Sequence, residues 1–182
     1  MKKILSIALV LCMIFALCAT SAFAEEDCKV AMITDYGDIT DQSFNQTTYE
    51  AVKAFGEANG VAYNYYKPSG DSTAERIAMV DAAIVDGYNV IVMPGYAFGG
   101  AIVEAAPEFP DVKFIALDVA AGDLLETAVA NAFSAVYQEE LSGYMAGVAA
   151  VKLGYKHLGY LGGMAVPAVQ RFGYGFLQGV DA

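Results

Sequence analysis

The sequence predicts an α/β fold, a doubly wound parallel-sheet lobe followed by the start of a second, incomplete α/β lobe. Short apolar runs alternate with segments of helical periodicity along most of the chain, which is typical of βαβ units and a parallel sheet. The runs are apolar at successive positions, as strands covered by helices on both faces require. Only one such run follows residue 133, and a single strand cannot form a sheet.

The predicted strands are bounded by turn residues. The segment Asp35 to Asp38 ends the first, Pro68 to Gly70 ends the second, and Pro94-Gly95 ends the third. The predicted strands cover residues 28–34, 61–66, 89–93, 113–117, 128–132 and 157–161.

Helical segments lie between most of these strands. Apolar residues recur at helical spacing after Ser43, and Gly60 supplies a helix stop. Ser72 followed by Glu75 is a capping-box pattern, and Pro107 is expected to end the third helix. The predicted helices cover residues 43–59, 72–85, 99–106, 136–153 and 168–179.

The N-terminal segment predicts a secretory signal peptide. Lys2 and Lys3 precede an apolar run that is short for a membrane span, and Ala22 and Ala24 stand at the −3 and −1 positions of a cleavage site. We therefore expect an exported protein, in the periplasm or at the extracellular face of the plasma membrane. The expected division is residues 1–24 as signal peptide, 25–132 as first lobe and 133–182 as the beginning of a truncated second lobe.

Composition excludes several functional classes. The chain has 182 residues, with 10 Lys and Arg against 21 Asp and Glu, and its net charge of −11 is wrong for neutralising nucleic-acid phosphates. Three cysteines and one histidine are too few for a cysteine framework or a zinc module. Cys12 and Cys18 each follow a leucine and Cys28 follows acidic residues, so the sequence does not support a lipid anchor. We interpret Cys28 as a small residue that leads into the first strand.

The candidate site lies at the carboxyl ends of the predicted strands, where open parallel sheets bind ligands. Carboxylates, an amide and aromatic rings are concentrated there. Carboxylates accept hydrogen bonds from neighbouring hydroxyls, and an aromatic face stacks on a planar ring. A nucleoside has both hydroxyl groups and a planar ring. A phosphorylated ligand would be repelled by the carboxylates. The candidate ligand contacts are Asp35, Phe44, Asn45, Gly95, Tyr96 and Asp118.

Each candidate also has a structural interpretation. Asp41 or Ser43 is expected to cap the first helix, Phe44 alone fits core packing better than stacking, and His157 fits a structural position on an apolar strand. The sequence has no phosphate-binding glycine-lysine motif, no Gly-x-Ser-x-Gly elbow, no calcium-loop spacing and no evident nucleophile–base pair. We therefore predict no catalytic residue, no metal and no cofactor.

The segment Thr34 to Gln46 closely resembles the opening signature of the basic membrane protein family. These are substrate-binding proteins of ABC importers, typified by purine nucleoside receptors. Phe114 to Asp118, Gln138 to Gly147 and Val169 to Gly179 are similar to later segments of the same family.

The resemblance implies a two-lobed type I periplasmic-binding-protein fold that closes around its ligand. It implies that Asp35 and Asp118 bind polar groups of the ribose or base. It also implies that Phe44 stacks on the base and that Asn45 hydrogen-bonds to it. The loop from Gly95 to Phe98, with Tyr96, is implied to line the cleft. It also implies a membrane permease as partner, no cofactor, and a monomer when the protein is complete.

The chain departs from the family in its length, because members are about twice as long and complete the pocket with second-lobe residues. We therefore expect this chain to bind nucleoside weakly or not at all. A sugar or autoinducer receptor of the same architecture is the alternative function. Two other functions fit less well. An exported α/β hydrolase that uses the acidic cluster would need an activating base, and none is evident. A cytoplasmic regulator of the same fold would need a DNA-binding headpiece, which is also not evident.

Overall fold

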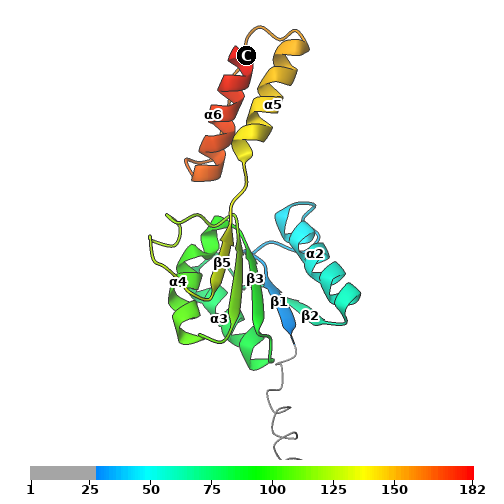
Figure 1. The fold of residues 1–182 in the computed structure, drawn as a ribbon, viewed down its shortest axis with the longest axis vertical. Helices are drawn as coiled ribbons and strands as arrows, with labels where there is room; N and C mark the ends of the chain where they lie inside the picture. The colour runs from blue at the N-terminus through cyan, green and yellow to red at the C-terminus, as the bar shows by residue number, and fades with distance from the viewer. Residues whose placement is uncertain (1–27) are drawn as a thin grey trace, which may run out of the picture.

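The computed structural model describes residues 28–182, so the signal peptide expected over residues 1–24 lies outside the described residues. The chain alternates strand and helix as far as α4 (Figure 1). The strands are β1 (Lys29–Ile33), β2 (Ala62–Tyr66), β3 (Val90–Pro94), β4 (Lys113–Leu117) and β5 (Ala132–Ala135). The helices are α2 (Phe44–Asn59), α3 (Thr73–Val85), the 3-10 turn η2 (Tyr96–Phe98), α4 (Gly99–Glu108), α5 (Glu139–Lys152) and α6 (Pro167–Asp181).

The five strands form one parallel sheet in the order β2-β1-β3-β4-β5. Val92 in β3 pairs with Met32 in β1 on one side and with Ile115 in β4 on the other. The chain moves outward from β1 to β2 and then returns to place β3 on the other side of β1, so the winding reverses between β1 and β3. A reversal of this kind opens a crevice at the carboxyl ends of the strands. The predicted doubly wound α/β class is confirmed.

Helices cover both faces of the sheet. Met32 and Val52 belong to the core cluster beneath α2. Ile33, Val80 and Ile102 belong to the larger cluster beneath α3 and α4, and all three are fully buried. This two-sided burial is the reason that the central strands are apolar at consecutive positions.

The predicted helix signals act as expected. The Glu75 N–H donates to Ser72 Oγ at 3.2 Å, which confirms the capping box at the start of α3. Gly60 ends α2 in the left-handed conformation, with φ of 66°. Asp41, rather than Ser43, supplies the side-chain cap of α2, because its Oδ1 accepts the N–H of Gln46 at 3.1 Å and Ser43 makes no side-chain cap bond.

Two expected strands need correction. The fifth strand runs over Ala132–Ala135 rather than 128–132, because its register is set by pairing with β4, where Phe114 lies opposite Ala132. The first sheet therefore extends to Ala135, and the expected division at residues 132 and 133 falls inside its last strand. Residues 157–161 do not form a strand, since no neighbouring strand is present there among the described residues. His157 is exposed in this segment, so its expected place on an apolar strand is wrong.

Helices α5 and α6 run parallel to each other and project from the carboxyl edge of the sheet (Figure 1). Gly143 and Gly147 of α5 lie against the backbone of α6, and Gly175 and Gly179 of α6 lie against the backbone of α5. A Cβ atom at Gly175 would overlap the Glu140 carbonyl oxygen. The two helices therefore pack through backbone contact rather than through interdigitated side chains.

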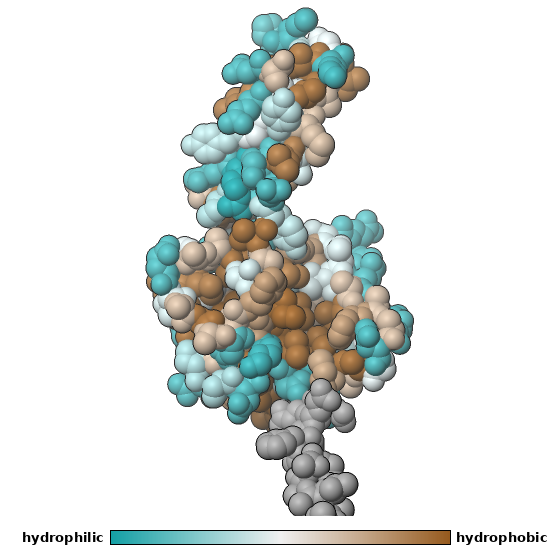
Figure 2. Space-filling view, viewed as in Figure 1, coloured by the Kyte–Doolittle hydropathy of each residue, from teal (hydrophilic) through white to brown (hydrophobic). Residues whose placement is uncertain are grey.

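Large apolar side chains are exposed on β5 and on the helix pair. Phe133 on the edge strand β5 is 66% exposed, and Leu161 in the segment between α5 and α6 is 97% exposed. Figure 2 shows apolar residues over the centre of the α/β lobe and in patches on the helix pair. Exposed apolar side chains of this kind are typical of surfaces that contact a partner or a ligand.

Candidate ligand-binding site

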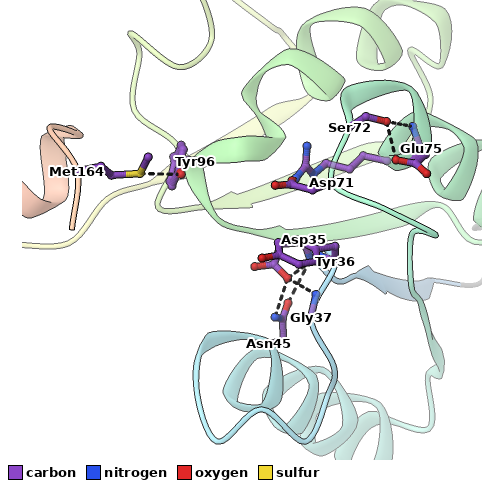
Figure 3. Close-up of polar contacts among 10 residues, drawn as sticks. Asp35, Tyr36, Gly37, Asn45, Asp71, Ser72, Glu75, Tyr96 and Met164 are labelled. Carbon is purple, nitrogen blue, oxygen red and sulfur yellow. Dashed lines mark hydrogen bonds and ion pairs between the residues drawn. The ribbon is translucent and has the colours of Figure 1, made fainter.

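The β1–α2 loop holds Asp35 in a fixed orientation at the end of the first strand. Asp35 Oδ1 accepts the backbone N–H groups of Tyr36 and Gly37, each at 2.6 Å, and the Asn45 side-chain amide at 2.9 Å (Figure 3). All of its side-chain hydrogen bonds with described residues fall on Oδ1. The second carboxylate oxygen is therefore available to a ligand.

Asn45 is used by the loop itself. Its side-chain nitrogen donates to Asp35 Oδ1 and to Asp41 Oδ2, both at 2.9 Å, and its Oδ1 accepts the Asp35 N–H at 3.2 Å. The residue is 4% exposed. In this arrangement every donor of the amide has a partner, so Asn45 acts on the position of Asp35.

These hydrogen bonds determine the charge of Asp35. Partial burial alone would raise the pKa of the carboxyl group, but the N–H groups of Gly37 and Tyr36 and the amide of Asn45 stabilise the carboxylate and hold its pKa below the ordinary value. Asp35 is consequently an ionised acceptor at neutral pH.

Asp118 directly follows β4 and has a strained backbone conformation. Its φ is 58°, in the left-handed region that few non-glycine residues adopt, and its N–H donates to the Ala135 carbonyl at 2.7 Å. Its half-buried side chain receives no hydrogen bond from the described residues. Burial raises the pKa of Asp118, and the nearby Glu139 carboxylate raises it further, while Arg171 partly offsets both effects. A strained carboxylate without a partner is typical of a functional position.

Phe44 faces a hollow rather than the core. It begins α2, belongs to neither core cluster, and packs edge-on against Tyr137 with ring centroids 6.2 Å apart. The hollow has a volume of about 550 Å³ and lies between the α/β lobe and the helix pair. Its lining includes Phe44 and Asp118 from the lobe and Glu139 and Phe172 from the helix pair. The structure thus brings two of the predicted contacts into one cavity.

Gly95 and Tyr96 follow β3 at the same edge. Gly95 has φ of 121° and ψ of 146°, a conformation open to glycine alone, and its N–H donates to the Leu117 carbonyl at 2.7 Å. Tyr96 donates its hydroxyl to Met164 Sδ at 3.1 Å (Figure 3). It also lines a second, smaller hollow that includes Asp118. Of the described side chains predicted as contacts, Asp35, Asn45 and Gly95 line neither of these two hollows.

Sequence reasoning missed several residues that line the two hollows, among them Tyr137, Glu139, Arg171 and Phe172. Glu139 is 7% exposed, and its Oε2 accepts Arg171 Nε at 2.6 Å. Burial would raise the pKa of Glu139, but the Arg171 guanidinium outweighs it and lowers that pKa. The pair joins the first turn of α5 to α6 and fixes the wall of the hollow.

Within residues 28–182, no group of three or more His, Cys, Asp and Glu side chains is arranged to hold a metal ion. None of the helices in the same residues has the length and apolar character needed to cross a membrane.

The fold and the site define a ligand-binding lobe of the solute-binding class. A solute-binding protein of an ABC transporter system from Aeropyrum pernix superposes with a TM-score of 0.68 at 26% identity, over 84% of this chain and 42% of that one. Residues 28–182 match the family described as ABC transporter substrate-binding protein PnrA-like, and the chain belongs to that family.

Sequence relatives agree with the family. The nucleoside-binding protein BmpA of an ABC transporter in Lactococcus lactis is 29% identical over 168 residues, which cover 90% of this chain and 46% of that protein. Basic membrane protein A of Borreliella burgdorferi is 27% identical over 181 residues, which cover 98% of this chain and 52% of that protein. A lipoprotein of Pyrococcus furiosus is 28% identical over 155 residues. The chain spans about half the length of the first two of these relatives and 38% of the third.

Proposed function

We propose that the chain is the first part of an extracytoplasmic nucleoside-binding protein that delivers its ligand to an ABC permease and makes or breaks no bond. Family membership supports the substrate-binding role, and the nucleoside-binding relative from Lactococcus lactis supports the ligand class. The observation that carries the proposal is the hollow that joins the ring of Phe44 to the unpaired carboxylate of Asp118. A planar base stacks on an aromatic ring and ribose hydroxyls donate to a carboxylate.

We propose a role for each predicted contact. Phe44 stacks on the base, and Asp118 accepts hydrogen bonds from ligand hydroxyl or amine groups. Asp35 offers its free carboxylate oxygen, and Asn45 positions Asp35 rather than contacting the ligand. Tyr96 lines the smaller hollow beside Asp118, and Gly95 forms the turn that precedes Tyr96 at the end of β3. We further propose residues 25–132 as the first lobe, extended by the end of β5, and a monomeric complete protein.

Charge makes the proposal specific. Asp118 and Glu139 are the carboxylates that line the hollow, and the Arg171 cation is already paired with Glu139. A phosphate group entering this hollow would meet uncompensated negative charge. The proposed ligand is therefore an unphosphorylated nucleoside.

The test is a nuclear magnetic resonance titration of the purified chain with inosine, guanosine and adenosine at millimolar concentration, with guanosine monophosphate, ribose and glucose as comparisons. We expect shifts at Phe44 and Asp118 with the nucleosides, smaller shifts with the monophosphate and none with glucose. Shifts produced by glucose but not by nucleosides would support the sugar receptor instead. Calorimetry that gives micromolar affinity for the chain alone would contradict the expected weak binding.

A further inference from the structure

One positively charged side chain near the carboxyl edge of the sheet is almost completely buried. Arg76 lies in the first turn of α3 and is 4% exposed. Its Nη2 forms an ion pair with the partly exposed Asp71 carboxylate, and its Nε has no hydrogen-bond partner among the described residues. Burial of a guanidinium is unfavourable, and a cation in the first turn of a helix also opposes the helix dipole. The local stability of α3 therefore does not explain Arg76.

The guanidinium packs on an aromatic ring of another loop. Arg76 Cζ is 5.5 Å from the centroid of the Phe98 ring, within the range of a cation–π contact. Phe98 ends the turn η2 and is fully buried in the larger core cluster. The Phe98 N–H donates to the Gly95 carbonyl at 3.1 Å, which closes the turn around Tyr96. Arg76 thus contacts the buried residue through which η2 is anchored in the lobe.

Arg76 joins two loops whose strands are not neighbours in the sheet. β1 lies between β2 and β3. Asp71 belongs to the loop after β2, and Phe98 belongs to the turn after β3. The loop that carries Asp35 follows β1, so it lies between these two at the carboxyl edge of the sheet. The contacts of Arg76 therefore connect the loops on either side of the Asp35 loop.

We propose that Arg76 is a positioning residue of the ligand site, which holds the turn η2 in place through its contacts with Asp71 and Phe98. This turn presents Tyr96, which lines the smaller hollow and donates its hydroxyl to Met164 Sδ at 3.1 Å. Arg76 lines neither of the two hollows, so it acts on the ligand only through the turn. The inference rests on the proposed nucleoside-binding function and adds a residue outside the hollows on which the site depends.

The experiment compares Arg76→Met, which removes the charge and the planar group, with the control Lys53→Met, which breaks an exposed ion pair within α2. Two measurements without ligand report on the turn: hydrogen exchange of the Phe98 amide, and nuclear Overhauser contacts between the Tyr96 ring and the Met164 methyl group. Guanosine affinity is then measured by nuclear magnetic resonance titration. Lys53→Met should match the original chain in all three measurements.

We expect Arg76→Met to speed exchange of the Phe98 amide and to weaken the contact of Tyr96. Guanosine binding should weaken by about three- to tenfold, the size of a lost cation–π contact. Arg76→Lys keeps the charge without the planar group and should recover part of this affinity. Asp71→Asn leaves the guanidinium on the ring and should have the same effects to a smaller degree, so it supplies the test if Arg76→Met does not fold.

Three outcomes separate the inference from the function on which it rests. If Arg76→Met lowers the unfolding midpoint but matches Lys53→Met in Phe98 exchange, Tyr96 contact and guanosine affinity, Arg76 serves stability alone and the inference is wrong. If the turn is displaced and guanosine affinity is unchanged, the site does not depend on the turn and the inference is also wrong. If the turn is displaced but guanosine shifts no residue of the original chain, the proposed function fails while the positioning of η2 by Arg76 stands.

Discussion

Asn45 and Asp35 exchange hydrogen bonds in both directions. The Asn45 amide donates to Asp35 Oδ1 at 2.9 Å, and the Asp35 N–H donates to Asn45 Oδ1 at 3.2 Å. The exchange ties the end of β1 to the first turn of α2. The orientation of the Asp35 carboxylate is therefore set before any ligand arrives.

Replacing Asn45 should loosen this loop. Asn45→Ala removes a buried amide that serves two carboxylates and one N–H, so we expect the free energy of unfolding to fall by about 1–3 kcal/mol. Urea denaturation measures the change. Asn59→Ala is the matched control, because the Asn59 amide is exposed near the end of the same helix and bonds only to the Phe55 carbonyl. Equal losses in the two variants would contradict the role given to Asn45.

Gly95 should be intolerant of any side chain for a backbone reason. No atom lies within 4 Å of the position where a Cβ would be added, so the cost of Gly95→Ala comes from its φ of 121° alone. We expect a loss of about 1–3 kcal/mol in unfolding free energy. Gly122→Ala, at a position equally open but without a positive φ, should be nearly neutral. If Gly95→Ala unfolds at the same urea concentration as Gly122→Ala, the strain argument is wrong.

Asp118 should trade stability for ligand binding. Its folded-state pKa is raised, so the protonated form favours folding at low pH, and that contribution is lost as pH rises through the folded pKa. Asp118→Asn removes the unfavourable charge and suits the left-handed φ, so we expect it to stabilise the fold at neutral pH by up to about 1 kcal/mol and to weaken nucleoside binding.

The pH dependence gives this prediction its check. The advantage of Asp118→Asn in urea denaturation should be larger at about pH 7 than at about pH 3.5, because the raised pKa leaves more of the original carboxyl protonated at the lower pH. Asp81→Asn, on the exposed side of α3, should show no such difference. An advantage that stays constant with pH would show that the charge of Asp118 is not the cause.

The ion pair between Glu139 and Arg171 should behave as a unit. Arg171→Met leaves the buried Glu139 carboxylate without its cation. We expect the free energy of unfolding to fall by about 1–3 kcal/mol, which is less than for a fully buried pair because solvent screens the partly exposed Arg171. Adding Glu139→Gln to that variant should recover most of the loss in thermal unfolding. A double variant that is additive would mean that the two side chains do not interact.

Local patterns located the first four strands. β1, β3 and β4 are largely buried apolar runs followed by turn residues, and β2, which is only partly buried, lies between Gly60 and Pro68. The fifth was misplaced because its start depends on distant contacts. The Asn131 amide donates to the carbonyls of Ala106, Phe109 and Val112, and this anchor sets where β5 begins. The alanine-rich residues before it resemble a strand but have no such constraint.

The misplaced fifth strand also explains why Tyr137 was not predicted as a site residue. The strand-end rule selected residues after β1, β3 and β4, and it would have selected Tyr137 had β5 been placed to end at Ala135. Phe172 and Arg171 could not be found in this way, since they reach the hollow through the packing of α6 on α5. The internal use of Asn45 was also hidden, because residue type alone does not show which partner an amide selects.

The glycine contact between α5 and α6 has a genetic consequence. Every missense change in a glycine codon introduces a Cβ atom. At four positions that atom would collide with the main chain of the opposing helix: Gly143, Gly147, Gly175 and Gly179. A saturation library should therefore recover only synonymous changes at these codons among folded clones. Substitutions should therefore accumulate on the outer faces of the helix pair, whereas the four glycines of the helix contact should not change.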